Sequence, residues 1–149
     1  MKTKIAIDPD VKKNGVAIFH EGKINSCTLP FFELISKIED FADPELFIEA
    51  GWLNHKKNFR YFGSIRNISN EVSARVGANH QIGKLLEEFA ISKKLNYHLI
   101  KPLRKCWKGA DGKITQQELN MILRAKGLEE LKRSNQDQRD AILILLNVL

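Results

Sequence analysis

The first part of the chain alternates short apolar runs with polar turns, a pattern that predicts β-strands. Residues 3–8 and 15–20 are rich in β-branched and apolar side chains, and a polar turn separates them. Residues 23–29 follow Gly22 and predict a third strand. Strands joined by such short turns pair as hairpins. We therefore expect three antiparallel strands before the first helix.

The middle of the chain changes between helical and strand patterns. Apolar residues recur at helical spacing over residues 31–41 and 70–93, and each stretch predicts a helix. Short apolar runs predict strands at residues 45–50 and 96–101. Residues 53–68 are polar, basic and aromatic without a clear period, which indicates a long loop or an irregular start of a helix.

The last part of the chain predicts two helices. Thr115 begins the first, with Glu118 at capping-box spacing, and Gly127 ends it. Ser134 begins the second. The predicted order is β-β-β-α-β-α-β-α-α over one domain, residues 1–149. Three strands followed by alternation predict an α/β fold with a mixed five-stranded sheet and helices on both faces.

Composition and charge narrow the classes of protein. A length of 149 residues suits one domain, and the net charge of +6 fits a partner rich in phosphate, such as nucleic acid. A mildly basic surface without such a partner fits equally well. No apolar run approaches the ~20 residues that span a bilayer, and the first eight residues are too short and charged for a secretion signal. Cys27 and Cys106 read as reduced thiols. We expect a cytoplasmic protein with no membrane partner.

Four acidic residues stand at positions that could bring them together. Asp8 and Glu49 each close an apolar strand, and Asp137 and Asp140 lie three residues apart at the start of the last helix. If that helix crosses the sheet near the two strand ends, four carboxylates meet and repel one another unless cations neutralise them. Carboxylate oxygens favour Mg²⁺ or Mn²⁺. Two such ions about 4 Å apart stabilise the attacking and leaving oxygens of a phosphodiester.

Each of these acids also has a purely structural explanation. Asp8 precedes a proline, where an aspartate commonly makes a turn. Asp137 stands three residues after Ser134 and fits a capping box, and Asp140 could interact with the helix dipole. Glu49 is the hardest to explain as structure, because a charge within an apolar run is costly unless it is paired or metal-bound.

Four segments together resemble the RuvC-type Holliday junction resolvases of the RNase H-like nuclease superfamily. The first hairpin of that family is similar to IAIDPDVKKNGVAIF, and its central strand is similar to FIEAGW. Its strand–proline–helix segment resembles HLIKPLRKCWKGADGKITQQELNMIL, and its closing helix resembles DQRDAILIL. The resemblance covers nearly the whole chain in the correct order, and it implies an RNase H-like fold.

The resemblance also implies an activity. It implies a magnesium-dependent crossover junction endodeoxyribonuclease that cleaves Holliday junctions or related branched DNA by phosphodiester hydrolysis, leaving 5′-phosphate and 3′-hydroxyl ends. Two Mg²⁺ ions, replaceable by Mn²⁺, would be held by Asp8, Glu49, Asp137 and Asp140. Lys113 would lie near the scissile phosphate; without the resemblance it is a solvated loop lysine. A homodimer from a bacterium or phage would place two active sites on one junction.

This sequence departs from the family pattern at the first turn and after the central strand. Asp10 follows Pro9 where the family has glycine, which could alter the turn or add a further acid. The segment 53–75 is longer than usual and could reshape the surface that faces the junction. These departures affect substrate preference more than the chemistry.

Aromatic and basic residues near the acidic motifs are candidates for DNA contact. Trp52 could stack on an unpaired base, or it could be a packed residue beside the core. Two basic stretches could contact phosphates, although such runs are often solvated faces; they contain Lys56, Lys57, Arg60, Arg66, and Lys101, Arg104, Lys105, Lys108. A non-catalytic RNase H-like module that binds branched DNA is the alternative function, and the complete set of four acids argues against it.

Overall fold

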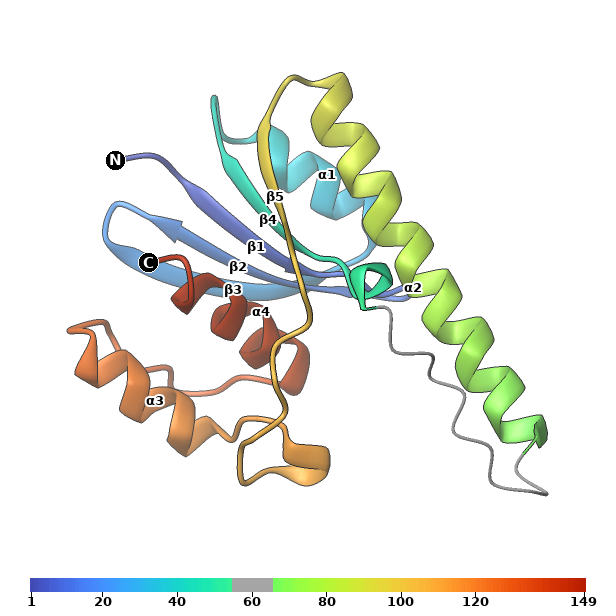
Figure 1. The fold of residues 1–149 in the computed structure, drawn as a ribbon. Coiled ribbons are helices and arrows are strands. Elements are labelled where there is room, and N and C mark those ends of the chain that lie inside the picture. The colour runs from blue at the N-terminus through green and yellow to red at the C-terminus, as the bar shows by residue number, and fades with distance from the viewer. Residues whose placement is uncertain (55–65) are drawn as a thin grey trace.

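The computed structural model describes residues 1–54 and 66–149, with the side chains of residues 66–69 left out. Its centre is a five-stranded sheet in the order β3-β2-β1-β4-β5 (Figure 1). The strands β1, β2 and β3 pair antiparallel, whereas β1–β4 and β4–β5 pair parallel. The strand bounds are β1 Lys4–Asp8, β2 Asn14–His20, β3 Lys23–Leu29, β4 Glu45–Glu49 and β5 Asn96–Ile100. The predicted mixed sheet is therefore confirmed.

Local chemistry explains the second hairpin. The strands β2 and β3 pair from Asn14↔Leu29 to His20↔Lys23, and Glu21 and Gly22 lie between their ends. Both turn residues have left-handed backbone, with φ of 49° and 79°. A two-residue turn of this kind matches the twist of its strands and so favours a tight antiparallel pair.

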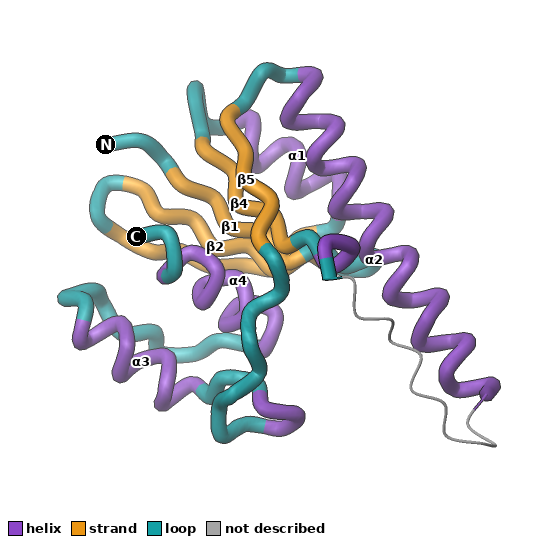
Figure 2. The backbone as a smooth tube through the Cα atoms, viewed as in Figure 1, coloured by secondary structure: helices purple, strands orange, loops and turns teal. Residues whose placement is uncertain are grey.

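Helices cover both faces of the sheet, as the sequence predicts. The helices α1 (Phe31–Glu39) and α2 (Arg66–Ser92) pack on one face, where Ile5, Ile7, Val16 and Ile18 meet Leu34, Ile38, Leu86 and Ala90. On the other face lies α4 (Gln136–Leu146), with α3 (Gln116–Ala125) outside it (Figure 1). The coloured tube of Figure 2 shows the long connection that leads from β5 past the sheet to α3.

Small side chains bring α4 close to the sheet. Ala6 and Ala17 are cross-strand partners on the α4 face, and Ala141 of α4 belongs to the same apolar cluster. All three are fully buried. Because no long side chain separates the two layers here, the backbone of α4 lies near β1 and β2, and its first turn reaches the end of β1.

The structure differs from the sequence prediction at two helix starts. Helix α2 begins at Arg66, four residues before the predicted start, and a short 3-10 helix, η1 (Gly51–Leu53), opens the predicted loop. Helix α4 begins at Gln136, with Asn135 rather than Ser134 as its N-cap. The Asn135 side chain accepts from the Gln138 N–H at 2.9 Å, and the Gln138 side chain accepts from the Asn135 N–H at 2.8 Å.

This capping box changes the interpretation of Asp137. The explanation that Asp137 closes a capping box with Ser134 is wrong, because the neighbouring pair Asn135 and Gln138 already fills both capping positions. The carboxylate of Asp137 therefore does not cap the helix. The capping box predicted at Thr115 and Glu118 is present, and Gly127 follows α3 with a φ of 69°.

Among the helices that the structure describes, none combines the length and apolar character needed to cross a membrane.

Candidate functional site

A pocket opens at the carboxyl ends of β1 and β4, beside the start of α4. The acids Asp8, Glu49, Asp137 and Asp140 all line it, as does Lys113. The sequence thus predicted five residues from four separate segments that the fold brings to one place.

The parallel pairing of β1 and β4 places the first two acids side by side. Ile7 of β1 and Ile48 of β4 are register partners. The next residue is Asp8 in β1 and Glu49 in β4. Because side chains alternate along a strand, these carboxylates lie on the same face as Ala6 and Phe47, whose side chains pack against α4. The two acids therefore point toward the helix that carries the other two.

A close backbone approach fixes the start of α4 against the sheet. Gly15 pairs with Asp8 across the first hairpin. A Cβ atom at Gly15 would overlap the carbonyl oxygen of Asp137 and lie 2.8 Å from its carbonyl carbon. Glycine is thus required here by space, and this contact holds Asp137 beside Asp8.

Burial and mutual repulsion raise the pKa of the acids at the strand ends. The pKa of Asp8 is raised well above its usual value by burial, then by the charges of Glu49, Asp140 and Asp137. Burial also raises the pKa of Glu49, and the charge of Asp140 adds to this effect. The negative charges of the pocket therefore oppose one another.

The third acid with a raised pKa is Asp137. Burial raises its pKa most, followed by the charges of Asp10 and Asp140. The positive charge of Lys113 opposes the shift at Asp8, Glu49 and Asp137 alike. A pocket of this kind favours positive charge, whether from protons, from a lysine or from bound cations.

A tied loop carries Lys113 into the pocket. The Trp107 N–H donates to the Gly112 carbonyl at 3.0 Å, and the Gly109 N–H donates to the Lys113 carbonyl at 2.9 Å. Asp111 and Gly112 both have left-handed backbone, with φ of 55° and 73°. This loop brings the Lys113 ammonium to 3.7 Å from one carboxylate oxygen of Asp140.

The acids share the pocket without converging on one point. Within residues 1–54 and 66–149, no group of three or more His, Cys, Asp or Glu side chains is arranged to hold a metal ion. Without a cation, the mutual repulsion of the carboxylates opposes their convergence. Gln136 Nε2 donates to Asp140 Oδ1 at 2.7 Å, and Lys113 lies beside its Oδ2.

Asp10, which stands where the family pattern has glycine, builds the first turn. Its Oδ1 accepts from the N–H groups of Lys12 at 2.8 Å and Lys13 at 3.3 Å. Asn79 of α2 donates to Asp10 Oδ2 at 3.4 Å and accepts from the Val11 N–H at 3.0 Å. The φ of Asp10 is not left-handed, so the turn needs no glycine. Asn79 has no signal in the sequence, because its role depends on how α2 crosses the turn.

The predicted DNA-contact residues are distributed unevenly around the pocket. Arg104 and Lys105 line it, and the charge of Lys105 counteracts the raised pKa of Glu49. Lys101 and Lys108 are exposed on the same connection and do not line the pocket. Arg66 begins α2, but its side chain is outside the described part of the chain, as are residues 56, 57 and 60, namely Lys56, Lys57 and Arg60.

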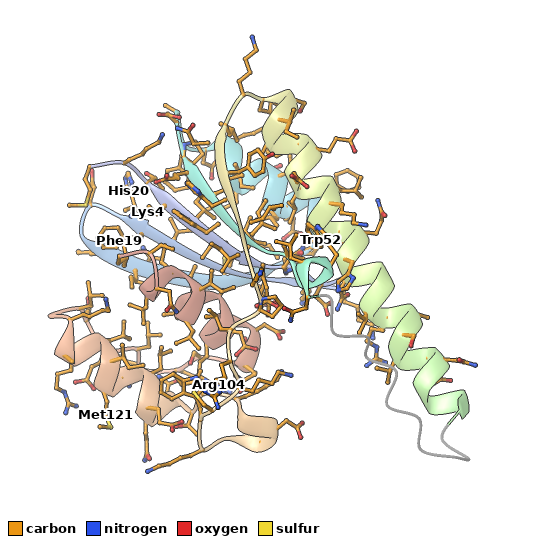
Figure 3. The ribbon with its side chains drawn as sticks, in the orientation of Figure 1. Lys4, Phe19, His20, Trp52, Arg104 and Met121 are labelled. Carbon is orange, nitrogen blue, oxygen red and sulfur yellow. The ribbon has the colours of Figure 1, made fainter. Side chains whose placement is uncertain are left out.

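Trp52, in η1, packs against α2 beside a second hollow. A Cβ atom at Gly83 would lie 2.5 Å from the indole ring, and Lys84 Nζ lies 5.8 Å from the ring centroid. The His80 ring meets the indole edge-on at 6.1 Å, and His80 lines the second hollow together with Asp8 and Glu49. Trp52 is half-buried, and Figure 3 shows it at the junction of these elements. Its packed role is therefore present, and base stacking stays a prediction.

Comparisons with known proteins support the fold. No protein-family model and no curated protein matches the chain. The structure is similar to that of Thermus thermophilus RuvC in complex with a Holliday junction substrate, with a TM-score of 0.57, 16% identity, and coverage of 98% of this chain and 91% of that chain. A second structure of Thermus thermophilus RuvC gives a TM-score of 0.41 at 17% identity, over 97% of this chain and 91% of that chain. The chain thus has the RNase H-like fold that RuvC also has.

Proposed function

We propose that this chain is a metal-dependent, structure-selective endonuclease that cleaves Holliday junctions or related branched DNA. One observation carries the proposal: Asp8, Glu49, Asp137 and Asp140 come from two parallel strand ends and one helix to line a single pocket. Their burial and mutual repulsion cost stability, and such a cost is typical of functional sites. The similarity of the fold to RuvC supports branched DNA as the substrate.

The chemistry of the donors fits a hard divalent cation. The four side chains offer carboxylate oxygens, the ligands that Mg²⁺ and Mn²⁺ prefer, and no thiolate or imidazole is among them. Asp8, Glu49, Asp137 and Asp140 would hold two such ions. When bound, the ions would activate the attacking water and stabilise the charge on the leaving oxygen.

Basic residues around the acids would bind and orient the DNA. Lys113 is held 3.7 Å from Asp140 and would stabilise negative charge that develops on the scissile phosphate. Arg104 and Lys105 line the same pocket and would hold the phosphates on either side. Further contacts are proposed for Trp52, Lys56, Lys57, Arg60, Arg66, Lys101 and Lys108. A homodimer would cut opposing strands of one junction, leaving 5′-phosphate and 3′-hydroxyl ends.

Cleavage of defined DNA substrates tests this proposal. End-labelled four-way junction, fork and linear duplex are incubated with Mg²⁺, Mn²⁺ or EDTA. We expect metal-dependent cleavage of branched substrates, and we expect Asp8→Asn and Asp140→Asn to bind the junction without cutting it. Asp40→Asn is the matched control, because Asp40 is an exposed aspartate paired with Lys37. Full activity of either pocket variant would refute the assignment.

A non-catalytic module that binds branched DNA is the second candidate. The basic residues that line the pocket, Arg104, Lys105 and Lys113, favour it, because they would bind phosphates whether or not the acids hold a metal. It predicts that the unmutated protein binds the junction equally well in EDTA and in Mg²⁺ and cuts no substrate with either metal. The same cleavage assay therefore separates the two functions.

A further inference from the structure

The first turn of α4 contains a hydrogen-bonded network beside the acidic pocket. Gln136 Nε2 donates to Asp140 Oδ1 at 2.7 Å, across one helical turn. Lys113 Nζ lies 3.7 Å from the other carboxylate oxygen of Asp140. The Asp140 side chain is 24% exposed and lines the pocket, so these two partners cover much of the carboxylate and leave part of it open to the pocket. Its orientation is thus set by one neutral donor and one cation.

Arg139 fixes the orientation of the Gln136 amide. Arg139 Nη2 donates to Gln136 Oε1 at 3.0 Å. An arginine has only donors, so the amide must present its oxygen to Arg139 and its nitrogen to Asp140. Arg139 Nη1 donates to the Ser134 carbonyl at 2.6 Å, which anchors the guanidinium to the backbone ahead of the helix.

The same two side chains also hold the segment that carries Lys113. Arg139 Nε donates to the Ile114 carbonyl at 3.2 Å, and Gln136 Nε2 reaches the same oxygen at 3.4 Å. Ile114 directly follows Lys113 and is almost fully buried. The network therefore joins the start of α4 to the loop that brings the lysine into the pocket.

We propose that Gln136 and Arg139 are positioning residues that hold Asp140 and Lys113 in a fixed relation, so that the pocket can bind a divalent cation. This inference rests on the proposed function, since it assigns the cation to the same four carboxylates. Residues that orient a metal-binding carboxylate typically contribute about 10- to 100-fold to metal affinity or activity. A purely structural role at the helix start would instead affect folding stability alone.

Binding of Mn²⁺ without DNA, measured by titration calorimetry, tests the inference independently of cleavage. We expect Gln136→Met, which removes the amide, to weaken Mn²⁺ binding about 10- to 100-fold. Junction binding in EDTA should stay unchanged. We expect Arg139→Lys to weaken Mn²⁺ binding in the same direction, because lysine keeps the charge but lacks the planar fork of donors.

Gln138→Met is the matched control. Gln138 lies two residues further along the same turn, contributes to the capping box and donates to the Ser26 carbonyl at 3.1 Å. It does not line the pocket. Its variant should lower the free energy of unfolding in urea while leaving Mn²⁺ binding at the unmutated value. If Gln136→Met does not fold, Gln136→Leu replaces it, because leucine also removes the amide and adds no charge.

The outcomes separate this inference from the proposed function. Unchanged or tighter Mn²⁺ binding by a folded Gln136 variant overturns the inference, and so does an equal loss in Gln138→Met. If Gln136→Met loses Mn²⁺ affinity but the unmutated protein cuts no DNA, the positioning role stands and the nuclease function fails. If the unmutated protein binds no Mn²⁺, both are overturned.

Discussion

The substitution Gly15→Ala tests whether the pocket requires the close approach of α4 to the sheet. In Gly15→Ala, the new Cβ would overlap the carbonyl oxygen of Asp137 and lie 2.8 Å from its carbonyl carbon. Both atoms belong to the backbone, so no side-chain rotation can relieve the clash and the first turn of α4 must move. The φ of Gly15 is not left-handed, so the effect is steric rather than conformational. Overpacking of this kind costs about 1–3 kcal/mol of unfolding free energy.

The same movement would separate the acids of the pocket. Asp137 and Asp140 would move with the displaced start of α4, whereas Asp8 and Glu49 would stay in place at the ends of β1 and β4. A misplacement of about 1 Å in a reacting geometry can cost on the order of 100-fold in rate. We therefore expect Gly15→Ala to bind a four-way junction in EDTA as the unmutated protein does, and to cleave it about 100-fold more slowly.

Gly77→Ala is the matched control for this substitution. Gly77 lies inside α2, and a Cβ atom there would meet nothing within 4 Å. Alanine at such a helical position should raise the free energy of unfolding by about 0.5–1 kcal/mol and leave cleavage unchanged. Urea unfolding and junction cleavage measure both effects. Native stability and rate in Gly15→Ala would refute the argument for a close approach.

Two further predictions concern charge. Because burial and like charges raise the pKa of Asp8 in the folded protein, that protein binds this proton more tightly than the unfolded chain does, and the metal-free form gains stability as pH falls through the raised pKa. Asp8→Asn should therefore raise the unfolding free energy at neutral pH in EDTA while it abolishes cleavage; a loss of stability would contradict the repulsion. Arg104→Ala and Lys105→Ala should each reduce the slope of log affinity against log salt by about 1 in junction binding, whereas Lys23→Ala, on the far strand, should not; unchanged slopes would remove both residues from the DNA surface.

Much of the fold follows from local sequence patterns. The period of apolar residues identified five strands and four helices, and the change from hairpins to alternation predicted the mixed sheet. Glu49 could be singled out because a charge that ends an apolar strand needs a local explanation. These features depend on residues close in the chain, and short-range chemistry is sufficient to predict them.

The sequence did not predict the N-cap of α4 correctly. Ser134 and Asn135 both suit an N-cap, and each has an acceptable partner three residues later. The structure selects Asn135, since Ser134 hydrogen-bonds Gln116 with its side chain and Arg139 with its carbonyl. The choice therefore depends on the contact of Ser134 with Gln116 of α3, which a local pattern does not contain.

The sequence by itself determined the elements, their order and the presence of acids at two strand ends and one helix start. Tertiary structure alone decided how those acids are supported: Gly15 lets α4 approach, Asp10 and Asn79 tie the first turn to α2, and Gln136 orients Asp140. The physical reason is that periodicity and propensity act over a few residues. Steric fit, hydrogen-bond partners and pKa shifts instead depend on which distant segments the fold places side by side.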